Sequence, residues 1–220
     1  MDKENLLTNL SKQKKDLLLK IIGVCFDECT TKQRRSIFDP FYETMSPPCK
    51  FNKEKLQAKF DKFKSDSYNG AYYAPFEINS KNYTHVPEET EKWFEDLGDL
   101  LLETKNLAKQ NKYSEVTHYF QKLFQLIDDM ESGDHDFIFA DEYGSWMIPV
   151  RMDDIVDCYI SSAAIVCDPK EFTEHLIPLF LRDSRESFSN HVMNYTKKYA
   201  KNEQMKFLMD ELKNKKIRVE

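Results

Sequence analysis

The chain has 220 residues, enough to bury roughly 70% of its unfolded surface in a single core. Hydrophobic residues make up 40% and charged residues 32%, with five glycines and eight prolines. This composition excludes fibrous and disordered proteins and predicts a helix-rich, single globular domain over residues 1–220. Within it we distinguish an N-terminal subregion 1–64, an aromatic loop 65–86 and a helical core 87–212.

Charge is distributed unevenly beneath the net value of −6. Residues 83–186 carry 9 basic and 23 acidic side chains, a net charge of −14, whereas the segments on either side each carry +4. An acidic centre repels nucleic acid, and neither end has a basic run with interleaved aromatics. The pattern predicts either a solvated acidic face or a docking surface for a basic protein partner.

The N-terminal sequence and the cysteines indicate in which cellular compartment the protein is expected. The first twenty residues lack the apolar region of a secretory signal, and no run reaches the roughly 18 apolar residues of a membrane span, so we expect a cytoplasmic protein that binds no membrane. The five cysteines form an odd set, typical of reduced thiols. A zinc site would need Cys25, Cys29, Cys49 and a distant fourth ligand, without the usual two close pairs, so we predict no cofactor.

The first third of the chain predicts three helices, at 3–28, 31–45 and 53–68. The first has apolar residues at three- and four-residue steps, and core packing is its main interpretation. Its lysines at 12, 14 and 15 leave a membrane-surface or partner-binding helix as the alternative. Pro40 limits the second helix, and Asn52 is expected to cap the third.

The helical periodicity stops in the aromatic loop 65–86. Five aromatic residues crowd this stretch, and two extended segments, 71–78 and 83–86, flank the turn-forming sequence Asn-Ser-Lys-Asn at 79–82. We predict a short β-hairpin here, although Pro75 favours an irregular or edge strand. Its aromatics are expected to cover the core, with lining of a ligand pocket as the alternative.

The helical core 87–212 shows the strongest periodicity. Helices are predicted at 87–108, 114–131, 151–166 and 169–182, followed by one or two that end near residue 212. The fold class is therefore mainly α, with stacked antiparallel helical hairpins and one or two small β-hairpin insertions. This arrangement is similar in style to tetratricopeptide and HEAT proteins, but the chain lacks their repeat periods.

The segment from Gly133 to Val150 is the longest run between these helices, and it holds four acidic residues, a histidine and four aromatics. Residues 137–140 and 145–148 predict a second hairpin around a turn at 141–144. Asp141 and Glu142 would form its acidic tip, flanked by Tyr143 and Trp146. Aromatic side chains beside charge are typical of interaction hot spots. We therefore predict a non-enzymatic protein-interaction module that uses this loop and the acidic centre.

The alternative is a metal-dependent hydrolase with ligands at Asp134, His135 and Asp136, since carboxylates and imidazole bind divalent metals. The pair His135–Asp136 resembles that of the all-helical HD phosphohydrolases, which implies a metal site. In that family the pair lies inside a helix with another histidine upstream, for which His118 is the candidate. No nucleophile triad or glycine-rich phosphate loop is present, which favours the non-enzymatic interpretation.

One further resemblance covers residues 137–172, about a sixth of the chain. The sequences Phe-Ala-Asp-Glu-Tyr-Gly-Ser-Trp at 139–146 and Cys-Asp-Pro-Lys-Glu-Phe at 167–172 are similar to a pattern in uncharacterised bacterial all-helical proteins. That resemblance implies a helical fold. It implies no activity and assigns no catalytic residue.

Overall fold

The computed structural model describes residues 2–30, 33–34, 37–38, 52–139, 144–182 and 187–217. The chain divides into two compact units, residues 1–48 (unit 1) and 49–220 (unit 2). The boundary falls before the first helix of unit 2 and differs from the subregion boundary expected at residue 64. In the described part of the chain no helix has the length and apolar composition needed to cross a bilayer.

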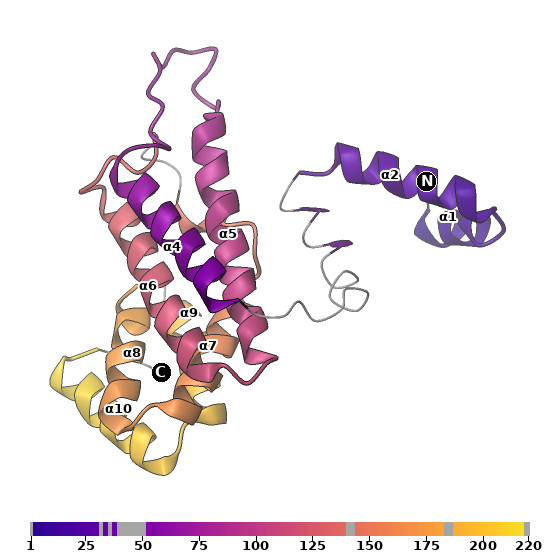
Figure 1. Cartoon of the computed structure of the whole chain (residues 1–220). Helices are drawn as coiled ribbons and strands as arrows, with labels where there is room; N and C mark the ends of the chain where they lie inside the picture. The colour runs from indigo at the N-terminus through magenta and orange to yellow at the C-terminus, as the bar shows by residue number, and fades with distance from the viewer. Residues whose placement is uncertain are drawn as a thin grey trace. The chain divides into compact units, whose positions relative to one another are not determined.

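Unit 1 contains α1 (Lys3–Leu10) and α2 (Lys15–Glu28), drawn in indigo in Figure 1. The single helix expected over 3–28 is therefore interrupted between Ser11 and Lys14. After α2, the Arg34 guanidinium donates hydrogen bonds to the carbonyls of Phe26 (2.7 Å) and Asp27 (3.1 Å) at the end of the helix. Most of the helix expected at 31–45 lies outside the described residues.

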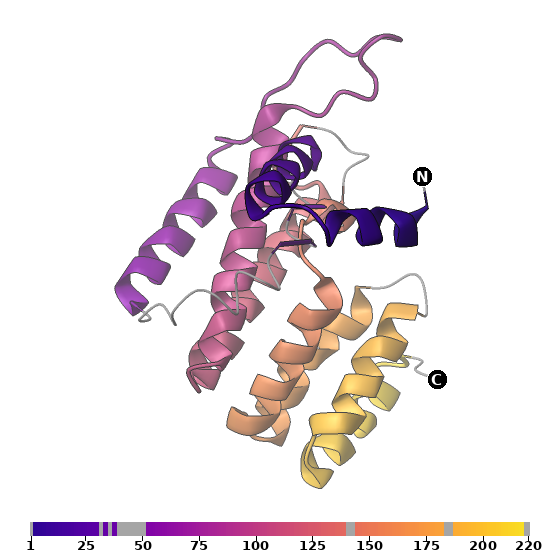
Figure 2. The ribbon, with the colours of Figure 1, turned by 90° about the vertical axis from the view of Figure 1, so that its right-hand side faces the viewer.

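All regular secondary structure in the described residues of unit 2 is helical, with short connections between most helices (Figures 1 and 2). Its α-helices are α4 (Lys53–Tyr68), α5 (Glu88–Ala108), α6 (Tyr113–Ser132), α7 (Met152–Val166), α8 (Pro169–Leu181), α9 (Ser187–Tyr199) and α10 (Asn202–Asn214). All begin and end within a few residues of the predicted positions, which confirms the mainly helical class. The predicted cap at Asn52 is also confirmed, since its side chain accepts a hydrogen bond from the Lys55 amide.

The core of unit 2 lies mainly between α5 and α6, which form an antiparallel hairpin across the turn at 109–112. Trp93, Leu97 and Leu101 of α5 are fully buried, as are Phe120 and Leu123 of α6. α4 packs against α5 on one side, and α7 packs against α6 on another. Further along the chain the helices pair alternately, α7 with α9 and α8 with α10. Two interhelical loops, 69–87 and the described part of 133–151, meet through the aromatic contacts of Phe139 described below.

Neither predicted β-hairpin is present in the described residues. In 71–86 the turn at 79–82 forms, and the Asn82 side-chain amide donates to the Glu77 carbonyl (2.9 Å), but the flanking segments do not pair as strands. In 144–150 the chain forms the 3-10 turn η1 (Ser145–Met147) in place of a strand. Aromatic packing between the two loops, described below, takes the place of strand pairing.

Candidate protein-interaction surface

The first contact between the two loops is an aromatic cluster around Phe139. The rings of Tyr73 and Phe76 lie 5.8 and 5.1 Å from the Phe139 ring, both edge-on. His85 packs edge-on against Phe76 at 5.3 Å. Since edge-to-face pairs add to the energy of simple burial, this cluster joins the 69–87 loop to the 133–139 segment. Tyr73 and Phe76 of the first loop therefore pack on the second loop.

A second cluster anchors the start of the 133–151 loop to α4. Phe137 is fully buried, and its ring lies 4.8 Å from Tyr68 and 6.2 Å from Trp93. The Tyr68 hydroxyl donates a hydrogen bond to the Asp129 carboxylate at the end of α6. Burial, together with this bond, raises the pKa of Tyr68 to about 12. The hydroxyl therefore remains a neutral donor that links α4 to α6 throughout the physiological range.

The three predicted metal ligands do not form a metal-binding group in the described residues. Asp134, His135 and Asp136 are all exposed, and the His135 ring also stacks on Phe137 (5.7 Å) and meets Tyr68 edge-on (5.1 Å). His118 lies fourteen residues before the end of α6, roughly 21 Å along the helix axis. In the described residues no three His, Cys, Asp or Glu side chains are grouped so that they could hold a metal. The geometry gives His135 a packing role.

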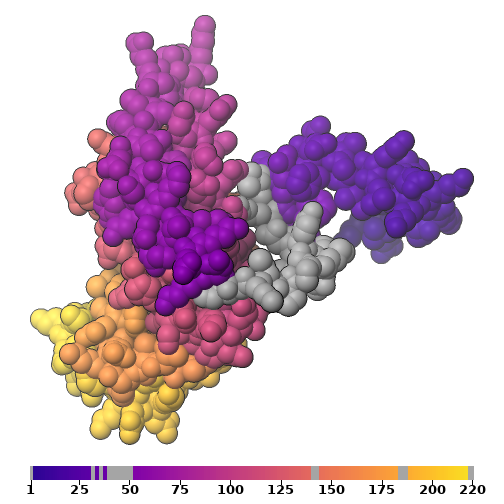
Figure 3. All heavy atoms as spheres, in the orientation of Figure 1, coloured from indigo at the N-terminus to yellow at the C-terminus, as the bar shows by residue number. Residues whose placement is uncertain are grey.

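Of the predicted recognition residues, Asp141, Glu142 and Tyr143 lie outside the described residues. Trp146 is described, and its side chain is 63% exposed. The turn η1 that carries it is held against the end of α6, because the Ser145 amide donates to Glu131 Oε1 at 3.0 Å. A large indole is therefore presented to solvent from a fixed backbone. Tyr83 (69% exposed) and Ile78 (59% exposed) lie on the neighbouring loop 69–87, which projects beyond the helices (Figures 1 and 3).

Many carboxylates of the acidic centre already have partners inside the chain. Asp128 pairs with Arg182 at 2.6 Å, and Asp154 pairs with Lys105 at 3.2 Å. Asp157 accepts hydrogen bonds from Tyr199 and Lys198. These internal pairs account for much of the acidic excess on α6 and α7. These carboxylates are available to an outside partner only if their internal ion pairs break.

Some of the exposed carboxylates that make no ion pair with the described residues lie beside the two loops, and others, such as Glu54 and Asp210, lie elsewhere in unit 2. The five beside the loops are Glu88, Glu89 and Glu91 in the first turn of α5, and Asp134 and Asp136 after α6. The three glutamates also suit the positive end of the α5 dipole. We call these five residues, together with Ile78, Tyr83 and Trp146, the loop-end surface. It combines negative charge with exposed apolar side chains.

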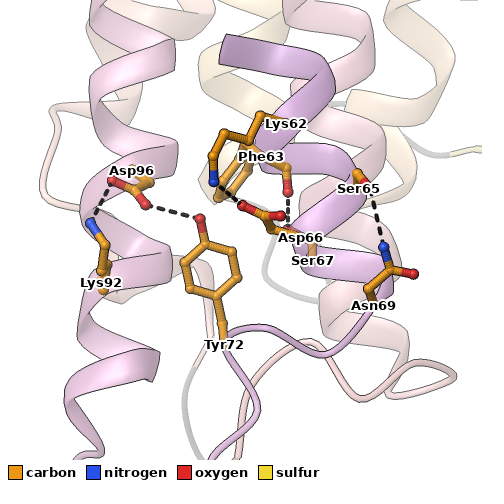
Figure 4. A network of polar contacts seen from close by, with 9 residues as sticks. All are labelled: Lys62, Phe63, Ser65, Asp66, Ser67, Asn69, Tyr72, Lys92 and Asp96. Carbon is orange, nitrogen blue, oxygen red and sulfur yellow. Dashed lines mark hydrogen bonds and ion pairs between the residues drawn. The ribbon is translucent and has the colours of Figure 1, made fainter. Parts of the chain in front are cut away.

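A groove of about 420 Å³ lies between α4 and α5 in unit 2. Figure 4 shows its polar network: Tyr72 donates to Asp96 Oδ2 (2.9 Å), and Lys92 pairs with Asp96 Oδ1 (3.2 Å). Lys59 of α4 pairs with Glu103 of α5 across the groove. Six of its eight charged lining residues form three ion pairs with one another, so the groove has less electrostatic attraction for a ligand than the loop-end surface has.

A buried link behind this groove was not foreseen from the sequence. The Trp93 indole N–H donates to Ser67 Oγ at 2.9 Å, and Ser67 Oγ donates to the Phe63 carbonyl at 2.8 Å. Trp93 was expected in the core stripe of α5, but no local pattern marks Ser67 as its partner 26 residues away. Long-range pairing of this kind depends on how α4 crosses α5.

No protein family, curated protein or solved structure matches this chain.

Proposed function

We propose that unit 2 is a non-enzymatic protein-interaction module whose loop-end surface binds a basic segment of a partner protein. The single observation that carries the proposal is that five exposed carboxylates without ion pairs, and the exposed side chains of Ile78, Tyr83 and Trp146, lie on or beside two loops that the Phe139 aromatic cluster joins. Carboxylates attract lysine and arginine over distance, and aromatic side chains provide contact area at low entropic cost. Asp141 and Glu142, which lie outside the described residues, would add two further negative charges to this segment.

Fixed backbone is the second support for this proposal. Aromatic contacts hold Phe139 and Phe137 against the neighbouring loop and α4, and the bond from Ser145 to Glu131 holds the turn that carries Trp146. A surface that is already ordered loses little conformational entropy when a partner binds. Because its backbone is already ordered, the loop-end surface is suited to binding a partner protein.

The test uses the full chain labelled for amide NMR, with deca-lysine as the probe, at low and high salt. We expect shifts at residues 78–91, 134–136 and 144–147, weakened by salt because the attraction is between exposed charges. Shifts confined to α7 and α9, or no shifts at low salt, would contradict the proposal.

Charge-reversal variants identify which residues act. Asp134→Lys with Asp136→Lys should weaken probe binding, and Asp141→Lys with Glu142→Lys should do the same, while the melting temperature stays nearly unchanged. Asp210→Lys, an exposed acid of α10, is the matched control and should leave binding intact. Equal losses in the control and the test variants would remove the loop end from the proposal.

The metal-dependent hydrolase remains the alternative function. It predicts a stoichiometric metal in the untagged protein, uptake of which is lost in His135→Ala. Metal bound equally well without the His135 side chain would exclude a site at residues 134–136.

A further inference from the structure

The two tryptophans of the chain have opposite environments. Trp93 is fully buried in the core of unit 2, whereas Trp146 is 63% exposed on the loop-end surface. Tryptophan is highly buried on average, and it is enriched among the residues that carry most of the binding energy at protein interfaces. The surroundings of Trp146 therefore indicate what kind of group the exposed indole would bind.

A hydrogen-bonded turn places the Trp146 indole beside a carboxylate. The Ser145 amide donates to Glu131 Oε1 at 3.0 Å, and the Met147 amide donates to the Gly144 carbonyl at 2.9 Å. A Cβ on Gly144 would lie 3.4 Å from Trp146 Cδ1 and 3.7 Å from Glu131 Oε1. The edge of the indole and the Glu131 carboxylate therefore flank the same side of Gly144, close to each other.

The charge of the surrounding segment has a single sign. Residues 123–150 contain seven acidic side chains and no lysine or arginine. Among the described ones, Glu131, Asp134 and Asp136 make no ion pair with the described residues. Negative charge next to an exposed aromatic ring favours a cationic group of a partner over a neutral or anionic one.

An indole beside a carboxylate selects arginine among the cationic side chains. A cation over an aromatic face is attracted by the ring quadrupole, and the indole is the strongest of these rings. The guanidinium is planar and weakly hydrated, so it can stack on the indole while its N–H groups donate to a carboxylate. Glu131 keeps acceptor capacity for such a bond, because the Ser145 amide uses only Oε1. The lysine ammonium is compact and strongly hydrated, and it has no planar face to stack.

We propose that Trp146 and Glu131 form an arginine-binding site, in which a guanidinium of the partner's basic segment stacks on the indole and donates to the carboxylate. This inference rests on the proposed function, because it names the residue type that the loop-end surface recognises. The other acidic side chains of the surface attract lysine and arginine alike. The site at Trp146 distinguishes arginine from lysine.

The test compares deca-arginine with deca-lysine, which have equal length and charge, in NMR titrations of the full chain at low salt. Deca-arginine should bind about threefold more tightly, the gain expected for an exposed cation–π contact. Its side-chain protons should shift upfield, because they lie over an aromatic ring. The Trp146 indole N–H signal should move, whereas that of Trp93, which is buried and bonded to Ser67, should stay in place.

Substitutions separate the aromatic face from simple apolar contact. Trp146→Leu should weaken deca-arginine binding about threefold and deca-lysine binding much less, with a nearly unchanged melting temperature because the side chain is exposed. Trp146→Phe should keep part of the preference, since phenylalanine still has an aromatic face. Glu131→Gln should lower the preference as well. Phe207→Leu, which removes an exposed ring on α10, is the matched control and should leave the preference intact.

The outcomes distinguish this inference from the proposed function. Equal affinity of the two probes for the unmodified chain, or equal losses of both in Trp146→Leu, would overturn the arginine site and leave the proposed function in place. No binding of either probe at low salt would overturn both. A Trp146 indole signal that moves with protein concentration in the absence of probe would mean that a second copy covers the ring, which would also overturn the arginine site.

Discussion

At the scale of single residues, the link from Trp93 through Ser67 to the Phe63 carbonyl is the most consequential polar contact in the core of unit 2. The side chains of Trp93 and Ser67 are buried, and the two hydrogen bonds join α4 to α5 directly. A buried donor that loses its acceptor keeps the full cost of its desolvation. The hydroxyl of Ser67 therefore matters more than its size suggests.

Ser67→Ala should lower the free energy of unfolding by about 1–3 kcal/mol, because the Trp93 N–H is left without an acceptor. Urea denaturation measures the change. Ser65→Ala, an exposed position half a turn earlier, should cost less than about 0.5 kcal/mol. If Ser67→Ala also stays below that value, the indole has found another acceptor and the link is not structural.

His175 gives a residue-scale prediction of pH dependence. Its Nδ1 lies 2.9 Å from the Tyr159 hydroxyl, and burial lowers its pKa below the ordinary 6.5, against a smaller opposite effect of Glu171 and Glu174. The unfolded chain therefore binds a proton at His175 before the folded chain does. Stability from this residue is present above pH 6.5 and is lost as the pH falls through the folded pKa.

His175→Gln should therefore flatten the decline in unfolding free energy between neutral and mildly acidic pH. Urea denaturation of both proteins at several pH values measures the difference. His191→Gln is the control, since His191 is an exposed histidine. A slope unchanged by His175→Gln would show that His175 is protonated equally in both states.

At the scale of elements, the helices of unit 2 followed from apolar periodicity and capping residues. The sequence Asp168-Pro169-Lys170-Glu171 forms the predicted capping box, in which Asp168 Oδ1 accepts from the amides of Lys170 and Glu171. Periodicity and caps are local, and a local pattern is sufficient when the helix also buries a continuous stripe.

The structure of the two loops could not be predicted from local sequence patterns in the same way. Extended segments rich in aromatics were interpreted as strands, but Tyr73 and Phe76 pack on Phe139, more than sixty residues further along. Strand pairing and cross-loop aromatic packing have the same local composition, and only the tertiary arrangement decides between them. The clustering of unpaired acids at the loop end depends on the same arrangement, so the sequence indicated its residue types without its geometry.

Substitution of glycine by alanine should have opposite effects on stability at Gly23 and Gly70. A Cβ on Gly23, inside α2, meets nothing within 4 Å, so Gly23→Ala should stabilise α2 by about 1 kcal/mol and slow hydrogen exchange of its amides roughly fivefold. Gly70 has φ +70° after α4, so Gly70→Ala should destabilise unit 2 by about 1 kcal/mol through backbone strain. Hydrogen exchange by mass spectrometry reports both, and equal signs would contradict the conformational argument.

At the scale of the whole molecule, the two units differ in how their apolar residues are used. Every buried hydrophobic residue in the described part of the chain belongs to unit 2, from Leu56 to Leu212. The stability of unit 2 should therefore be independent of unit 1.

Removal of residues 1–48 should leave the melting temperature of unit 2 within a few degrees of its value in the full chain, because no buried core side chain is lost. Removal of residues 202–220 is the matched truncation at the other end. It deletes α10, exposing the surface of α8 that packs against it and removing the buried Leu208 and Leu212, so it should lower the melting temperature sharply or prevent folding. Circular dichroism during heating measures both. A large loss in the first truncation would mean that unit 1 stabilises unit 2 through contacts outside its buried core.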